Sequence, residues 1–203
     1  VPNESAAWER VSGGDGFYIQ IAPDFTTYAG SQFGDYSRID TDGGWTRVRP
    51  DAPRMNEPAQ RFNWQTPILL SAHSPNVLYY GSNRLWRSLE RGENLQPISP
   101  VLTCPEEVGN VPYGTITTVA ESRQTFGIIY VGTDDGRVHM TPDAGFSWQE
   151  IGNYLPSGLW CTRLECSHHT DGVVYMSLNG YRQDDFRTYL YQSRDFGQTW
   201  VSI

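Results

Sequence analysis

Short runs of β-branched and aromatic residues follow one another along the chain, and each run is bounded by Gly, Pro, Asn or Ser. One stretch shows the pattern well, because it predicts four strands in succession, at residues 68–71, 77–80, 85–87 and 95–99. No stretch keeps the apolar spacing of an amphipathic helix. The pattern therefore predicts an all-β chain of short antiparallel strands.

The second of these strands recurs along the chain. Its copies are residues 27–30, 78–81, 129–132 and 174–177, which share the tyrosines Tyr28, Tyr79, Tyr130 and Tyr175. The tyrosines stand about 50 residues apart, a period typical of the four-stranded blades of a β-propeller. The repeat therefore predicts four blades.

A turn motif recurs with a similar period. Residues 141–148 and 193–200 both read S/T-x-D-x-G-x-S/T-W, and residues 40–47 and 88–95 are weaker copies. In such a turn the hydroxyl and the Asp can hydrogen-bond the backbone, and the Gly adopts a conformation that side chains resist. The Trp then packs as the chain returns to the sheet. We therefore expect six motif residues to be structural: Asp143, Gly145, Trp148, Asp195, Gly197 and Trp200.

The two periods describe one propeller segment that covers residues 1–203. Its predicted parts are the last strand of a preceding blade with a linker at 1–15, and blades at 16–53, 64–103, 113–155 and 159–203. Four blades can close a ring, but the stray strand, which begins at Trp8, has no place in it. We therefore expect part of a larger propeller, or an open arc that the remaining blades or another copy of the chain completes.

The turn motif resembles the Asp-box of the BNR-repeat β-propellers. Residues 12–18, 61–71 and 130–136 are similar to large bacterial BNR-repeat proteins described as glycosyl-hydrolase-like or sortilin-like. The resemblance covers essentially the whole chain and implies a secreted or cell-envelope protein. Xyloglucanases, sialidases, photosystem assembly factors and sortilin receptors share this architecture, so the fold does not choose among them.

The net charge and the cysteine content limit the kinds of partner and cofactor that the chain is expected to bind. The chain has 203 residues and a net charge of −8, which argues against nucleic acid or an anionic membrane as a main partner. No transmembrane run, signal peptide, phosphate loop or metal-spaced Cys/His set is present, so neither a cofactor nor a metal is predicted. Cys161 and Cys166 are spaced to point to opposite faces of one strand, which disfavours a disulfide or a shared metal. We expect buried free thiols.

Aromatic residues recur in the loops that lead into the innermost strands, on the face where a propeller usually binds ligands. They are Tyr18, Trp64, Tyr113 and Trp160, and Arg163 lies close to the last of them. A ring of aromatics would suit stacking on sugars. The same side chains could instead plug the channel or pack between blades.

Acidic residues occupy neighbouring loops. The candidates for acid–base catalysis are Asp15, Asp35, Asp134, Asp135, Asp184 and Asp185. The adjacent pairs could also bind Ca²⁺, or they could serve only the turn. The loop at 179–187 is enlarged relative to the other blades and adds Tyr181 and Arg182 as ligand-binding candidates, since insertions in a repeat often carry function.

Two functions are compatible with these features. The first is a binding module that recognises a glycan or a protein on its axial face. The alternative is part of a secreted, xyloglucanase-like glycoside hydrolase with a carboxylate acid and base. A sialidase is disfavoured. Such an enzyme needs three arginines, and only Arg163 has a plausible position. A third possibility is that self-association into a ring is the main property of the chain.

Overall fold

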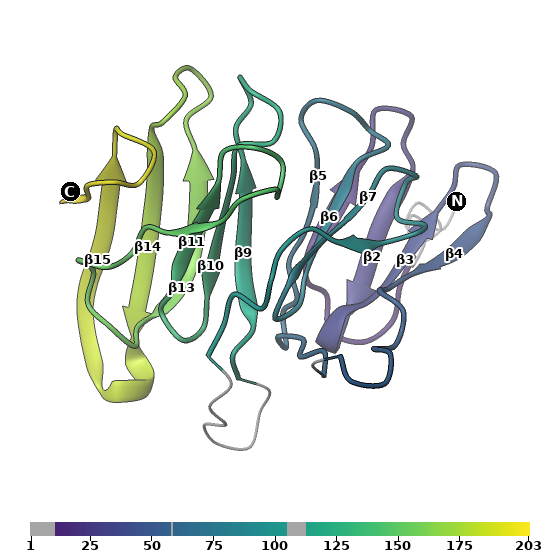
Figure 1. The fold of residues 1–203 in the computed structure, drawn as a ribbon. Helices are drawn as coiled ribbons and strands as arrows, with labels where there is room; N and C mark the ends of the chain where they lie inside the picture. The colour runs from purple at the N-terminus through teal and green to yellow at the C-terminus, as the bar shows by residue number, and fades with distance from the viewer. Residues whose placement is uncertain (1–10, 58, 105–112) are drawn as a thin grey trace, which may run out of the picture.

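The computed structural model describes residues 11–57, 59–104 and 113–203, which form four four-stranded antiparallel sheets (Figure 1). Consecutive strands are neighbours in every sheet, so each sheet is a simple meander. The described residues contain no α-helix, and two short 3₁₀ turns, η2 (Gln32–Gly34) and η3 (Tyr181–Gln183), join strands. The predicted all-β fold with four-stranded blades is confirmed.

The sheets are numbered as blades 1 to 4 in chain order. Blade 1 consists of β1 (Ile19–Ile21), β2 (Thr27–Ser31), β3 (Asp35–Ile39) and β4 (Trp45–Val48). Blade 2 consists of β5 (Ile68–Leu70), β6 (Leu78–Gly81), β7 (Leu85–Ser88) and β8 (Gln96–Pro97). Blade 3 consists of β9 (Ile116–Glu121), β10 (Ile129–Thr133), β11 (Val138–Thr141) and β12 (Gln149–Glu150). Blade 4 consists of β13 (Trp160–Cys166), β14 (Val174–Gly180), β15 (Asp185–Ser193) and β16 (Val201–Ser202).

The hydrophobic core lies between blades rather than within one. The blades stand side by side (Figure 1), and the first strands β1, β5, β9 and β13 contact one another in succession. Three clusters of buried side chains fill the spaces between adjacent blades. Because alternate residues of a strand point to opposite sheet faces, an inner blade contributes to two of these clusters. This arrangement explains why the strands are rich in apolar residues on both faces.

The repeated tyrosine marks the face of each blade that looks toward the next one. Tyr28, Tyr79 and Tyr130 are fully buried in the three clusters. The hydroxyl of Tyr79 donates a hydrogen bond of 2.8 Å to Glu121 of blade 3. On blade 4 the equivalent Tyr175 is 38% exposed. The outer face of blade 4 is therefore open in this chain.

Glycine follows the repeated tyrosine where the next blade comes close. A Cβ on Gly81 would lie 3.0 Å from the Cγ2 atom of Ile116, and one on Gly132 would meet the sulfur of Cys161. Both contacts are tighter than packing allows, so these glycines let the first strand of the next blade approach. The equivalent residue on blade 4 is Ser177.

The turn at 141–148 carries its own hydrogen bonds and also holds the preceding blade. Asp143 accepts hydrogen bonds from the backbone N–H of Ser147 at 2.8 Å and from its hydroxyl at 2.6 Å. The hydroxyl of Thr141 accepts from the N–H of Gly145 at 2.9 Å. The indole of Trp148 then donates to the carbonyl of Ile98 on blade 2 at 2.8 Å. The turn is therefore a joint between blades 3 and 2.

The turn at 193–200 repeats this arrangement one blade later. Asp195 accepts from the N–H of Thr199 at 2.9 Å and from its hydroxyl at 2.6 Å. The indole of Trp200 donates to the carbonyl of Ile151 on blade 3 at 2.9 Å. In both turns the hydrogen bonds of the Asp hold the carboxylate in its charged form, which lowers its pKa.

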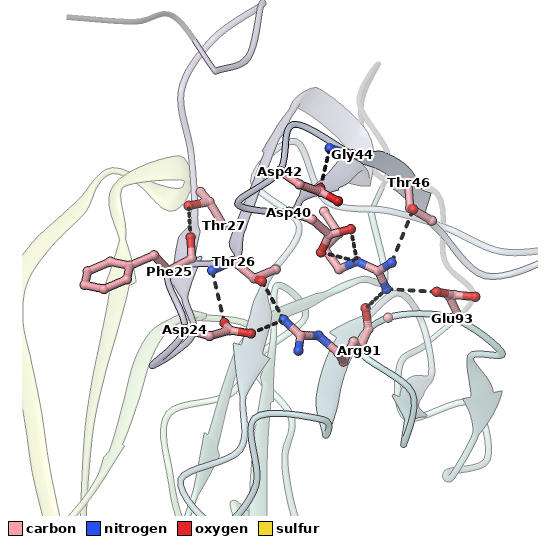
Figure 2. Close-up of polar contacts among 12 residues, drawn as sticks. Asp24, Phe25, Thr26, Thr27, Asp40, Asp42, Gly44, Thr46, Arg91 and Glu93 are labelled. Carbon is pink, nitrogen blue, oxygen red and sulfur yellow. Dashed lines mark hydrogen bonds and ion pairs between the residues drawn. The ribbon is translucent and has the colours of Figure 1, made fainter. Parts of the chain in front are cut away.

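Charged groups connect the turn at residues 88–95 to blade 1 (Figure 2). This turn has no Trp to donate an indole N–H. Arg91 of this turn pairs with Asp24 of blade 1 at 2.7 Å and also bonds Thr26. Arg38 of blade 1 donates to the carbonyl of Arg91 at 3.1 Å and pairs with Glu93 at 2.9 Å. Two arginines therefore connect this turn to blade 1, and Arg87 makes the counterpart of the Arg38 contact at the next junction, where it donates to the carbonyl of Ala144 at 3.1 Å.

The structure bears on two further expectations, the orientation of the cysteines and the strand at the start of the chain. Cys161 and Cys166 do not face opposite sides, because the strand register shifts at a bulge after Cys161 and both thiols lie in the same buried cluster. Both are free cysteines, as expected, and burial raises their pKa. The stray strand that was predicted to begin at Trp8 lies outside the described residues, apart from Val11.

Candidate functional site

A cavity of about 260 Å³ lies where residues of all four blades meet, on the side of the loops that were expected to form the axial face. We call it the axial cavity. It is lined by Tyr18, Asn63, Gln65, Thr117, Trp160, Thr162, Asn179 and Tyr181. Three of these residues are aromatic, and the others carry amide or hydroxyl groups. The lining therefore offers ring faces and hydrogen-bonding groups without a carboxylate or a cation.

Strand geometry sets the position of the aromatic residues. Trp160 is the first residue of β13 and is paired with Asn179 near the end of β14, so these two stand side by side at the rim. Tyr18 immediately precedes β1, and its hydroxyl donates to the carbonyl of Thr117 at 3.5 Å. Burial raises the pKa of the Tyr18 phenol, which Arg163 partly offsets. Tyr18 is therefore a neutral hydrogen-bonding group at neutral pH.

A chain of hydrogen bonds supports the opposite wall. The side-chain amide of Asn63 donates to the hydroxyl of Thr115 at 2.9 Å, and that hydroxyl donates to Asp134. The backbone N–H of Thr115 donates to the same carboxylate at 2.8 Å. The backbone N–H of Gln65 donates to the Asn63 side chain at 3.0 Å. Asp134 therefore holds the cavity wall from behind, two hydrogen bonds away from the space itself.

Asp134 and Asp135 act in the structure as anchors between loops. The Asp134 side chain is almost fully buried, with 2% of it exposed, and burial raises its pKa to about 6. Asp135 accepts hydrogen bonds from the backbone N–H of Cys104 and from the hydroxyl of Thr133. Neither carboxylate lines the axial cavity. Only the Thr133 contact lies within the turn, and the other contacts tie the turn to the segments around Cys104 and Thr115.

The enlarged loop at 179–187 is shorter than the sequence indicated. Strands β14 and β15 extend to Gly180 and from Asp185, and these two residues pair with each other. Only η3 and Asp184, which has a left-handed backbone (φ 56°), connect the strands. The extra residues therefore lengthen the hairpin, because Gly180 and Asp185 continue the ladder on both sides of a tight turn.

The two acids of this hairpin also lie apart from the cavity lining. Asp185 pairs with Arg187 at 2.6 Å and accepts a hydrogen bond of 2.6 Å from the Tyr189 hydroxyl. These bonds hold the pKa of Asp185 well below its usual range. Asp184 is exposed. The hairpin instead contributes Tyr181 to the lining, and Arg182 lies over the ring of Trp160.

The remaining sequence candidates are dispersed. Trp64 is 45% exposed and packs edge-on against Phe33 with ring centroids 5.0 Å apart. Tyr113 is half-buried. Asp15 accepts a hydrogen bond from Gln32 at 2.7 Å, and Asp35 pairs with Arg47 at 3.0 Å, both on the surface. The structure thus brings together Tyr18, Trp160 and Tyr181 at one cavity, whose lining does not include Trp64 or Tyr113.

A second cavity of about 230 Å³ lies farther along the innermost strands. It is lined by Gln20, Leu69, Leu70, Ala72, Val119, Ala120, Glu121, Arg123, Arg163 and Glu165. Arg163, a predicted ligand-binding residue, is found here, where it pairs with Glu165 at 2.8 Å. Glu121 accepts from the Tyr79 hydroxyl at 2.8 Å and from the N–H of Ala72 at 3.2 Å. This cavity therefore has charged walls, in contrast to the axial cavity.

Sequence reasoning missed several lining residues. Asn63, Gln65 and Thr162 were expected in the entry loops of the axial face but were not singled out as ligand-binding residues, and Thr117, Glu121 and Glu165 lie inside strands. Asn179 was included only as the first residue of the enlarged loop. Its Oδ1 atom is buried and has no hydrogen-bond partner among the described residues. No sequence signal identifies such a group, because the lining depends on which residues of four blades converge.

Neither a metal centre nor a membrane-spanning helix is found in the described ranges. Residues 11–57, 59–104 and 113–203 contain no group of three or more His, Cys, Asp or Glu side chains that could hold a metal ion. The same residues contain no helix long and apolar enough to cross a membrane.

No protein-family model and no curated protein matches the sequence. Solved structures do match the fold. The Niastella koreensis GH74 enzyme has a TM-score of 0.64 and 15% sequence identity, with 94% of this chain and 30% of that chain covered. An ancestral GH74 enzyme has a TM-score of 0.65 and 16% identity, with coverages of 94% and 24%. The GH74 xyloglucanase of Xanthomonas campestris has a TM-score of 0.55 and 21% identity, with coverages of 94% and 38%.

These similarities confirm the predicted β-propeller fold. This chain is similar in structure to propeller domains of GH74 glycoside hydrolases, and it spans 24–38% of the length of these three enzymes. At such low identity the similarity concerns the fold alone, and the fold does not determine the activity.

Proposed function

We propose that this chain is a non-catalytic BNR-type binding module of a secreted protein, and that it recognises a glycan in the axial cavity. The observation that carries the proposal is the lining of that cavity. Trp160, Tyr18 and Tyr181 offer apolar ring surface with polar edges, and Asn and Gln amides stand between them. Aromatic surface combined with fixed hydrogen-bonding groups is a feature of small-molecule sites, and here the polar residues outnumber the aromatic ones.

The unpartnered Oδ1 atom of Asn179 supports this proposal. A buried polar group without a partner is costly, and native proteins rarely leave one unexplained. A ligand hydroxyl would satisfy this oxygen once the Asn179 side chain turns toward the cavity. The lining residues are aromatic, amide and hydroxyl groups without a charge of their own, and such groups suit a neutral sugar. The volume of about 260 Å³ suits one or two sugar units rather than a long chain.

Substitution of Asn179 by leucine should weaken binding of a neutral oligosaccharide about 10-fold to 100-fold, because a hydrogen bond is lost and a sugar hydroxyl is left unpaired. Isothermal titration with a panel of neutral oligosaccharides measures the effect. The exposed Asn153, away from the cavity lining, provides a matched control as Asn153→Leu, with unchanged affinity expected. If no member of the panel binds, the glycan proposal is wrong and a protein ligand becomes the better candidate.

A glycoside hydrolase is the second candidate, and one observation favours it. Glu121 and Glu165 both line the second cavity, and glycoside hydrolysis uses two carboxylates, one as acid and the other as base or nucleophile. If the chain or its parent protein hydrolyses a glycan there, Glu165→Gln should lower kcat by at least about 1,000-fold, because that step depends on the charged or protonated carboxyl group. Reducing-end release measures turnover. Undetectable turnover with the whole panel would remove this candidate.

A further inference from the structure

The ring of Trp160 is covered by a cation from the neighbouring hairpin. The guanidinium carbon of Arg182 lies 4.0 Å from the ring centroid of Trp160 and 5.4 Å from that of Tyr181. Both rings line the axial cavity, whereas Arg182 does not. The guanidinium therefore covers one face of the Trp160 ring beside the axial cavity.

The hairpin turn holds Arg182 in this place. Arg182 is the middle residue of η3, and the turn is closed by the N–H of Asp184, which donates to the carbonyl of Tyr181 at 3.3 Å. The side chain of Gln183 donates to the carbonyl of Gly158 at 2.9 Å and ties the turn to the segment before β13. The backbone of the turn is thus fixed close to Trp160, while the Arg182 side chain can rotate.

Arg182 differs from the other arginine of this hairpin. Arg187 is bound to the carboxylate of Asp185 by an ion pair of 2.6 Å. Within the described residues, Arg182 makes no ion pair or hydrogen bond, and its contacts are the two aromatic rings. At an exposed site such cation–π contacts are weak. Arg182 is therefore held in place by contacts that a ligand can outcompete.

We propose that Arg182 is a displaceable cover of the glycan-binding site and thereby sets its specificity. This inference rests on the function proposed above and adds a role for the hairpin. A neutral sugar that stacks on the covered face of Trp160 must first move the guanidinium away, so its affinity is reduced by the strength of that contact. The cover also excludes ligands too weak to displace it.

Removal of the cover should strengthen binding. For Arg182→Ala we expect an affinity for neutral oligosaccharides about 2-fold to 5-fold higher than that of the unmodified chain, which is the fold-change that matches an exposed cation–π contact. Trp160→Ala should abolish detectable binding with or without Arg182. Arg187→Ala removes a cation from the same hairpin but not from the Trp160 ring, and should leave the affinity unchanged.

Titrations should include neutral oligosaccharides and their uronic-acid counterparts. A lower affinity of Arg182→Ala for neutral oligosaccharides would contradict the proposed role of Arg182 as a cover. Strong binding of the acidic sugars that depends on Arg182 would also contradict it. The second result would make Arg182 a carboxylate-binding residue instead. In either case a glycan still binds, so the proposed function stands.

A measurement without ligand tests the geometry itself. In NMR spectra, the ring current of Trp160 should shift the Arg182 Hδ resonances upfield, and Trp160→Leu should remove the shift. An absent shift would overturn the inference whatever binds. If the shift is present but neither sugar class binds, the proposed function is wrong. The role of Arg182 as a cover of a glycan-binding site is then wrong as well.

Discussion

Replacement of Gly145 by alanine is expected to lower the free energy of unfolding by about 3 kcal/mol. Gly145 has a backbone φ of +99°, which strains any other residue, and a Cβ would lie 2.5 Å from the carbonyl oxygen of Ile98. This oxygen belongs to the backbone of blade 2, so it cannot rotate away. It is also the acceptor of the Trp148 indole, so a shift would disturb both contacts.

The matched control is Gly43→Ala. Gly43 also has a positive φ, +87°, but nothing lies within 4 Å of its added Cβ. Only the backbone strain remains, and we expect a loss of about 1 kcal/mol. Urea denaturation of both variants measures the difference. Equal losses would contradict the conclusion that the turn at 141–148 is a joint between two blades.

The second large effect concerns pH. Burial raises the pKa of Asp134 to about 6 in the folded chain, whereas an unfolded Asp titrates near 4. As pH rises from 4 to 6, the unfolded chain loses this proton first, so the contribution of Asp134 to stability falls. In Asp134→Asn nothing titrates at this position. The stability of the variant relative to the unmodified chain should therefore increase by about 2 kcal/mol between pH 4 and pH 7.

Denaturant titrations of both proteins at several pH values give this difference directly. Other acids, such as Asp143 and Asp195, are common to both proteins, so their contributions to the pH dependence cancel in the difference. Asp135→Asn removes only a neighbouring charge, a smaller cause than burial, so most of the pH dependence should persist in that variant. A stability difference between Asp134→Asn and the unmodified chain that stays constant with pH would show that Asp134 ionises as an exposed acid.

The sequence predicted the blades because their signals are local. A turn whose Ser or Thr, Asp and Gly bond one another, as at 141–148, needs no distant partner, and a tyrosine that recurs with its strand reveals the period. The bulge after Cys161 has no such signal. It results from the pairing of β13 with β14, and it reversed the expected orientation of the two thiols.

The candidate site could be predicted only in part, for the same reason. Tyr18, Trp160 and Tyr181 were expected on the axial face and do meet there. Trp64 has an equivalent place in the repeat, yet it packs against Phe33, a residue that the other blades do not share. The contact of Arg182 with Trp160 depends on a side-chain orientation across two strands. Such convergence follows from the packing of blades, which a repeat pattern does not encode.

The replacement of glycine by Ser177 on blade 4 limits how this array could grow by duplication. Gly81 and Gly132 present no side chain to the first strand of the following blade, which comes close to both. Ser177 stands at the equivalent place on blade 4, and its hydroxyl lies 2.7 Å from the hydroxyl of Thr162. A blade added beyond this face in the same geometry would first require glycine at position 177. The four repeats are therefore alike in shape but not interchangeable as building units.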